Sequence, residues 1–155
     1  MTPDELAKAG TEHAHQKALF AWANCAALYG FNAADDDRSY DLKLRQQLIA
    51  GAWACNVAPI PALSRLFAIH NQGHGDAIRG GRARAEGVKS GVPDIMLPIP
   101  RGKWHGLFIE LKKPKTGVLA PYQREWLNYL DNAGYVTYVA YGWREAANFL
   151  KDYLR

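Results

Sequence analysis

Two acidic residues embedded in strand-like sequence constrain this chain more than any other feature. Asp94 directly precedes the apolar run 95–97, and Glu110 directly follows the apolar run 107–109, with Lys112 two residues further on. Burying a charge without a partner is very costly. Acids in such runs therefore need a cation beside them or a chemical role.

The two runs predict neighbouring strands at Val92–Leu97 and Gly106–Lys112. Side chains alternate between the faces of a strand, so Glu110 and Lys112 share one face. If the strands pair antiparallel, Asp94 lies opposite Glu110. Two carboxylates in one small space repel each other unless a cation sits between them. We therefore expect the pair to hold a divalent metal ion over a phosphodiester.

The remaining elements are predicted from apolar periodicity and from stop signals such as Pro and Gly. They are a helix from the cap Thr11 to Tyr29, a helix over Leu42–Ala54, a strand over Leu66–Ile69, a helix over Pro121–Asn132, a strand over Tyr135–Tyr141 and a helix over Trp143–Leu154. This order predicts an α/β fold with a central mixed sheet flanked by helices. We expect a single domain over residues 1–155, with an elaboration at about 31–64.

The first long helix carries an acid at the mouth of an apolar stripe. Residues at helical spacing along this stripe are Glu12, Gln16, Leu19, Ala23 and Ala26. Two interpretations of Glu12 stay open. It stabilises the helix dipole from the first turn, or the stripe packs on the sheet and carries Glu12 to the edge of the site. His13 and His15 point to different sides of a helix, so we expect them at the surface or at a partner.

Positive charge is concentrated in one window of the chain. Residues 76–116 hold nine Lys or Arg against four acids, whereas the rest of the chain has ten against eleven. A basic surround suits a polyanionic substrate, although a solvated basic face gives the same count. The residues expected beside a nucleic acid in the glycine-rich part of this window are Arg79, Arg82, Arg84 and Lys89.

Composition and the remaining motifs favour a soluble, cytoplasmic protein. An apolar content of 48% excludes a disordered chain, and no run has the length of a membrane span or the pattern of a signal peptide. Cys25 and Cys55 lack metal-ligand spacing and are interpreted as free thiols. The acidic run 35–37 lacks a calcium-loop pattern and is interpreted as a solvated turn.

Pro93-Asp94, followed after fifteen residues by Glu110-Leu111-Lys112, resembles the PD-(D/E)xK nuclease pattern. More specifically, the chain resembles the VRR-NUC branch, the virus-type replication-repair nuclease domain. The resemblance also rests on Glu12 with Gln16, Ile69-His70-Asn71, Lys89 to Asp94, Phe108 to Lys112, Gln123 and the strand ending at Ala140. It covers most of residues 11–154, without about 31–64.

The resemblance implies a restriction-endonuclease-like core and Mg²⁺- or Mn²⁺-dependent cleavage of DNA, often branched or flapped. Stand-alone members of viral origin look like Holliday-junction resolvases that act as homodimers, which implies action inside a host cell.

The resemblance also implies roles for single residues. The metal ligands would be Asp94, Glu110, Glu12 (directly or through water) and the Leu111 carbonyl. Lys112 would orient or activate the attacking water, and Gln123 would support the site from the following helix. Further DNA contacts are expected at Asn71, Ser90, Lys113 and Lys115. Ala120 departs from the hydroxyl cap expected before Pro121.

Two alternatives to catalysis remain. A non-catalytic DNA-binding module would use the basic window 76–116 alone, and a structural protein would bind neither metal nor DNA. Carboxylates that repel phosphate are of no use to a binding module, so the acid–acid–lysine set favours the nuclease.

Overall fold

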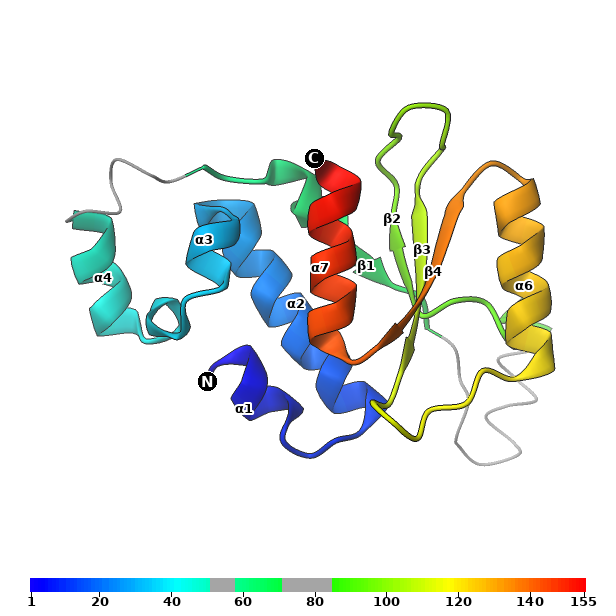
Figure 1. Cartoon of the computed structure of the whole chain (residues 1–155), viewed down its shortest axis with the longest axis horizontal. Helices are drawn as coiled ribbons and strands as arrows, with labels where there is room; N and C mark the ends of the chain where they lie inside the picture. The colour runs from blue at the N-terminus through cyan, green and yellow to red at the C-terminus, as the bar shows by residue number, and fades with distance from the viewer. Residues whose placement is uncertain (51–57, 71–84) are drawn as a thin grey trace.

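The computed structural model describes residues 1–50, 58–70 and 85–155 (Figure 1). In chain order the elements are α1 (Pro3–Ala7), α2 (Glu12–Tyr29), α3 (Phe31–Ala34), η1 (Asp37–Tyr40), α4 (Leu42–Ala50), η3 (Pro61–Arg65), β1 (Phe67–Ala68), β2 (Ile95–Leu97), β3 (Leu107–Lys112), α6 (Pro121–Asn132), β4 (Val136–Tyr141) and α7 (Trp143–Leu154).

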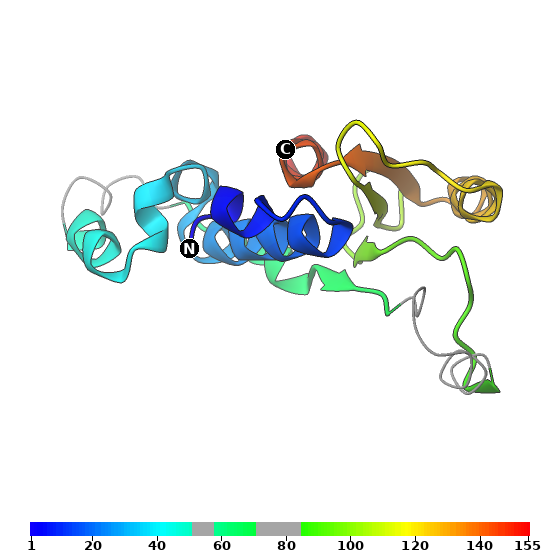
Figure 2. The ribbon, with the colours of Figure 1, turned by 90° about the horizontal axis from the view of Figure 1, so that it is seen from below.

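A four-stranded mixed sheet in the order β1-β2-β3-β4 forms the centre of the molecule. β1 and β2 are antiparallel, as are β2 and β3, whereas β4 runs parallel to β3 after the crossover through α6. Helices α2 and α7 lie on one side of the sheet and α6 lies on the other (Figures 1 and 2). The predicted α/β class is therefore confirmed.

β3 is the most deeply placed strand, because both of its faces are covered. All six of its residues are buried. Leu107, Ile109 and Leu111 belong to the core that α2 and α7 share. On the opposite face Phe108 packs edge-on against Tyr135. The alternation predicted along this strand is thus confirmed, and Glu110 lies on the face that α6 covers.

The first long helix forms as predicted, and its cap explains where it begins. The Thr11 hydroxyl accepts a hydrogen bond from the Ala14 amide at 3.1 Å, and the helix ends at Gly30, whose φ is +89°. Leu19 and Ala23, from the predicted apolar stripe, are fully buried. This stripe anchors α2 on the sheet and leaves Glu12 at the free end of the helix.

His15 does not lie at the surface, so that prediction was wrong. Its side chain is buried, and its Nδ1 accepts a hydrogen bond from the Trp143 amide at 3.4 Å. The reason is that the start of α7 packs against this side of α2, which local periodicity does not reveal. Burial lowers the pKa of His15, and His13 is exposed as expected.

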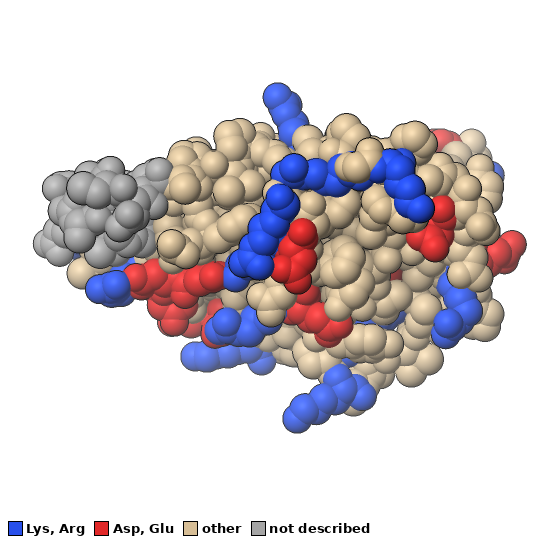
Figure 3. Space-filling view, turned by 45° about the horizontal axis from the view of Figure 1, so that its top comes forward, with Lys and Arg blue, Asp and Glu red and all other residues tan. Residues whose placement is uncertain are grey.

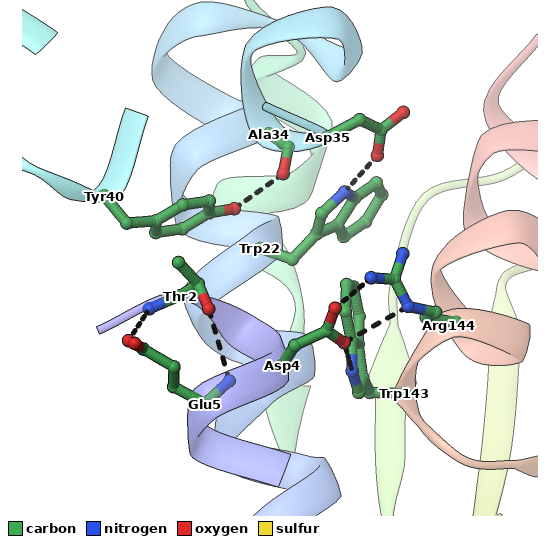
Figure 4. Close-up of polar contacts among 9 residues, drawn as sticks. All are labelled: Thr2, Asp4, Glu5, Trp22, Ala34, Asp35, Tyr40, Trp143 and Arg144. Atoms are coloured by element: carbon green, nitrogen blue, oxygen red, sulfur yellow. Dashed lines mark hydrogen bonds and ion pairs between the residues drawn. The ribbon is translucent and has the colours of Figure 1, made fainter. Parts of the chain in front are cut away.

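Helix α1 was not predicted. Thr2 and Glu5 cap it reciprocally, and Asp4 points from it toward the start of α7 (Figure 4). One Asp4 oxygen accepts from the Trp143 indole and the Arg144 Nε, both at 3.2 Å. A short helix at the chain start thus closes the side of α2 that holds His15.

The acidic run 35–37 is more than the solvated turn we expected. Asp35 accepts a hydrogen bond from the Trp22 indole at 2.9 Å (Figure 4) and pairs with Lys151 at 2.6 Å. Asp36 pairs with Arg38 at 2.5 Å. The run therefore ties the segment after α2 to the core and to α7.

Several boundaries differ from the predictions. β1 is confined to Phe67–Ala68, and β2 begins at Ile95 rather than at residue 92. Pro93 has no amide hydrogen for a ladder bond, which shortens β2. The helix predicted to reach residue 54 is described to Ala50, and its remainder lies outside the described residues.

Cys25 is a buried free thiol, and burial raises its pKa. Cys55 lies outside the described residues. No helix in the described part of the chain is long and apolar enough to cross a membrane.

Candidate active site

Asp94 is held at the point where β2 begins. Ile95 pairs with Ile109 in the antiparallel ladder, so the next position along places Asp94 opposite Glu110. The Asp94 carboxylate accepts a hydrogen bond from the Leu111 amide at 2.9 Å, and its carbonyl accepts one from the Ile69 amide at 2.7 Å. Both neighbouring strands therefore fix this residue, and its carboxylate stands in for a missing ladder bond.

Glu110 and Lys112 form a buried ion pair on the α6 side of β3. Their exposed fractions are 1% and 5%, and the Lys112 Nζ lies 2.7 Å from the Glu110 Oε1. The Gln123 side-chain amide donates a second hydrogen bond to the same oxygen. The other oxygen, Oε2, is buried and has no hydrogen-bond partner among the described residues. A buried acceptor without a partner is costly, so this oxygen faces a position suited to a cation or a donor.

The electrostatics of the pair follow from burial and from like charge. Burial, together with the Asp94 carboxylate, raises the pKa of Glu110 to about 7, although Lys112 opposes the increase. Burial by itself would lower the pKa of Lys112, but the hydrogen bond and charge of Glu110 outweigh it and the pKa is raised. Lys112 is therefore a cation. Its charge alone does not offset the effects of burial and of Asp94 on the pKa of Glu110.

Glu12 lies at the rim of this cluster. Its Oε1 is 4.0 Å from the Lys112 Nζ, and its side chain is 48% exposed. Within residues 1–50, 58–70 and 85–155 no three His, Cys, Asp or Glu side chains are grouped closely enough to hold a metal ion by themselves. The structure thus places Asp94 near Glu110, whereas Glu12 lies on the far side of Lys112.

Gln123 connects the start of α6 to the cluster. Its Oε1 accepts a hydrogen bond from the Ala120 amide at 3.0 Å while its amide group donates to Glu110. Ala120 gives the helix no side-chain cap, as the sequence predicted. Gln123 satisfies one backbone donor of that first turn from inside the helix, so a single side chain links a helix end to a buried carboxylate of the cluster.

The segment that leads to Asp94 packs against α6. The Trp126 indole donates a hydrogen bond to the Ser90 carbonyl at 3.0 Å. Gly91, with φ at +87°, lies so close that a Cβ there would be 2.7 Å from the Tyr122 ring. The sequence reasoning missed Trp126, whose spacing of three from Gln123 was the available signal.

The structure describes only some of the residues expected to contact DNA. Lys89, Ser90, Lys113 and Lys115 are exposed. The other four expected contacts lie outside the described residues, and these are Asn71, Arg79, Arg82 and Arg84. The face in Figure 3 carries Lys and Arg side chains next to Asp and Glu side chains rather than an unbroken basic surface.

Comparisons with known proteins bear on the family and the fold of this chain. A family model described as the VRR-NUC domain matches residues 52–143, which is more than half of the chain and includes Asp94, Glu110, Lys112 and Gln123 but not Glu12. A solved structure titled "VRR_NUC domain protein" is similar over 93% of this chain and 88% of its own, with a TM-score of 0.56 and 24% identity. At that identity the likeness concerns the fold. No curated protein gave a significant match.

Proposed function

This chain belongs to the VRR-NUC domain family, a family of nuclease domains, and from that premise we propose that it is a divalent-metal-dependent DNA endonuclease. The observation that carries the proposal is the cluster of Asp94, Glu110 and Lys112, in which a buried Glu110 oxygen has no partner among the described residues. We propose that the substrate is branched or flapped DNA, such as a Holliday junction.

The donor set suits Mg²⁺ or Mn²⁺. Hard cations prefer carboxylate and carbonyl oxygens, and Mg²⁺ is commonly held by one or two carboxylates with several waters. Asp94 and Glu110 would provide the carboxylates. The Leu111 amide points toward Asp94, and its carbonyl lies on the same side of the strand, so it would complete the protein ligands. Glu12 would act directly or through a water. When bound, such an ion stabilises negative charge on the phosphate and makes water a better nucleophile.

Lys112 and Gln123 have separate roles in this proposal. Lys112 is a buried cation next to the carboxylates, so it can hold a water molecule or a non-bridging phosphate oxygen in place. Gln123 keeps the Glu110 carboxylate in one orientation from α6. The exposed Lys89, Lys113 and Lys115 would contact phosphates, which positions DNA without reading its sequence.

Cleavage of a panel of labelled DNA substrates tests the proposal. The panel contains a four-way junction, flaps, duplex and single strands, each incubated with Mg²⁺, Mn²⁺ or EDTA. We expect metal-dependent nicking that falls by about 100-fold or more in Asp94→Asn and Lys112→Ala, the usual scale for losing an electrostatic group of this kind. Glu125→Gln on the exposed side of α6 removes a carboxylate outside the cluster and should cleave normally.

Binding measurements on the same variants separate catalysis from recognition. Asp94→Asn should bind the preferred DNA at least as well as the wild type, because it removes a charge that repels phosphate. Salt-sensitive binding without turnover on any substrate would establish the non-catalytic module instead. A homodimer suits a two-fold symmetric junction, and we propose this state, which sedimentation of the free protein and of its junction complex would test.

A further inference from the structure

Helix α6 carries three aromatic side chains that lie outside the core cluster of the described residues. Tyr122, Trp126 and Tyr129 are four and three residues apart, so they project from one side of the helix. The buried residues Leu127 and Leu130 occupy another side. Tyr122 is 52% exposed and Tyr129 is 65% exposed, and Trp126 is half-buried between them. We call these three residues the aromatic row.

The aromatic row begins beside the carboxylate cluster and leads away from it. Tyr122 directly precedes Gln123, whose side-chain amide donates a hydrogen bond to the Glu110 carboxylate. The other end of α6 meets the opposite end of β3, because the His105 amide donates to the Gly134 carbonyl at 2.9 Å. A strand that follows the row from its first tyrosine therefore starts at the cluster.

The length of the row corresponds to a short piece of single-stranded DNA. From Tyr122 to Tyr129 an α-helix rises by about 10 Å. Stacked bases are about 3.4 Å apart along a strand, so the row is about as long as three stacked nucleotides. α6 lies at the edge of the molecule in both ribbon views (Figures 1 and 2), and both tyrosines are accessible there.

The segment before Asp94 lies along the row and supplies a cation. The Trp126 indole donates a hydrogen bond to the Ser90 carbonyl at 3.0 Å, and a Cβ at Gly91 would be 3.1 Å from the same indole. Lys89 and Ser90 are exposed at this edge of the molecule. A positive charge is therefore available for the phosphates of a strand whose bases lie on the row.

We propose that the aromatic row binds about three nucleotides of single-stranded DNA that extend from the cluster. The inference rests on the proposed nuclease function and names the feature of the substrate that the enzyme recognises, an unpaired flap. Aromatic side chains stack on any base without reading its identity. A base in a duplex is already stacked on both faces, whereas an unpaired base has a face free for Tyr122 or Tyr129. A flap is therefore favoured over a fully paired four-way junction.

The alternative occupant is a second copy of this chain. With twelve residues, α6 is about 18 Å long and about 10 Å wide, so one side of it covers roughly 180 Å². A stable protein interface buries about 800 Å² on each partner. The row by itself is therefore too small to hold a dimer together, whereas its length suffices for a short single strand.

The test uses the full-length chain in EDTA, so that binding is measured without cleavage. Labelled duplexes carry a 5′ or a 3′ flap of increasing length, from none to about six thymidines. Affinity measured by fluorescence anisotropy should rise with flap length up to about three or four nucleotides and then level off. Tyr129→Ala should weaken binding of the long flaps by about 10-fold, which corresponds to about 1.4 kcal/mol, and change binding of the unflapped duplex by less than about two-fold.

Three further variants make the result specific to stacking. Tyr129→Phe keeps the aromatic ring and should retain the dependence on flap length, whereas Tyr129→Leu keeps apolar bulk without a ring and should lose it. Leu28→Ala removes a side chain that is 62% exposed near the far end of α2, and it should have no effect. Circular dichroism and melting verify the fold of each variant, and sedimentation gives its oligomeric state.

The outcomes separate this inference from the proposed function. If Tyr129→Ala binds every flap as the wild type does, or loses flapped and unflapped DNA equally, the row does not bind a single strand, whether or not the protein cuts DNA. A dimer that dissociates in Tyr129→Ala would assign the row to a contact between copies and would also overturn the inference. If flap binding depends on the Tyr129 ring but no metal supports cleavage, the row assignment stands and the nuclease proposal fails.

Discussion

Replacing Glu110 by Gln measures how much the ionised Glu110 side chain lowers the free energy of unfolding. In the metal-free protein, burial and the neighbouring Asp94 raise the pKa of Glu110 to about 7 from an ordinary value of 4.5. Between these two pH values the folded protein holds a proton that the unfolded chain has released. The free energy of unfolding therefore falls as the pH rises through this window, because the folded state binds more protons.

The size of this effect follows from the difference between the two pKa values, which is about 2.5. Each pKa unit corresponds to about 1.4 kcal/mol, so ionisation of Glu110 lowers the free energy of unfolding by roughly 3 kcal/mol across the window. The side chain is 1% exposed, so solvent screens it little. For a chain of this length the loss corresponds to a decrease in Tm of roughly 6–12 °C. The amide introduced by Glu110→Gln does not titrate, so that variant lacks this contribution.

Urea denaturation in EDTA, at intervals from about pH 4.5 to about pH 8, measures the effect. We expect the stability of the wild type to fall relative to that of Glu110→Gln as the pH rises to about 7, and then to run parallel to it. Glu125→Gln removes an exposed carboxylate from α6 and should follow the wild type. Mg²⁺ should raise the wild-type Tm at about pH 8 more than at about pH 5. Parallel stability curves for Glu110→Gln and the wild type over the whole window would refute the reasoning.

Two further predictions concern the contacts that support the cluster. Gly91→Ala places a Cβ 2.7 Å from the Tyr122 ring and 2.9 Å from the Tyr122 carbonyl oxygen, whereas the Cβ of Gly87→Ala meets nothing within 4 Å at a similar positive φ. Backbone strain should lower the free energy of unfolding of both variants by about 1 kcal/mol. Urea denaturation should show a clearly larger decrease only for Gly91→Ala. Gln123→Ala removes the bonds to Ala120 and Glu110 and should cost about 1–2 kcal/mol. It should also raise the pKa of Glu110 further, so that the stability loss extends to higher pH than in the wild type; an unchanged pH dependence would mean that this contact does not form in solution.

The elements that local patterns define were predictable from the sequence. Helix α6 runs over Pro121–Asn132 as expected, because Pro fits its first turn and Gly134 follows its end with φ at +88°. Alternation along β3 correctly separated the core face from the face with Glu110. These features depend on neighbours within a few residues, which a sequence displays directly.

Features that depend on packing between distant segments were not predictable in the same way. His15 is buried because the start of α7, more than a hundred residues later, covers it. Asp35 looked like a solvated acid and instead bonds to Trp22 and Lys151. β2 is shorter than the predicted strand Val92–Leu97, because Pro93 has no amide hydrogen and the Leu111 amide bonds to the Asp94 side chain instead.

The sequence indicated which residues belong to the candidate site better than it indicated how they are arranged. The register that places Asp94 opposite Glu110 followed from strand alternation and an antiparallel pairing. The unpaired Glu110 oxygen and the half-exposed position of Glu12 did not, because they depend on how α2 and α6 meet the sheet. The ligand roles of these residues, and the DNA contacts, stay predictions.

Asp94 shows why the fold and the proposed chemistry place opposite demands on the same atoms. Its carboxylate supports the structure through the Leu111 amide, and it also destabilises the structure by repelling Glu110. Asn at position 94 keeps an oxygen for that amide and removes the repulsion, whereas Ala removes both. A purely structural Asp94 would make Asn equal to or worse than Asp in metal-free stability. An acid retained for a cation would make Asn more stable without metal and unresponsive to Mg²⁺. The order of stability among Asp, Asn and Ala at this one position therefore shows which demand the residue serves.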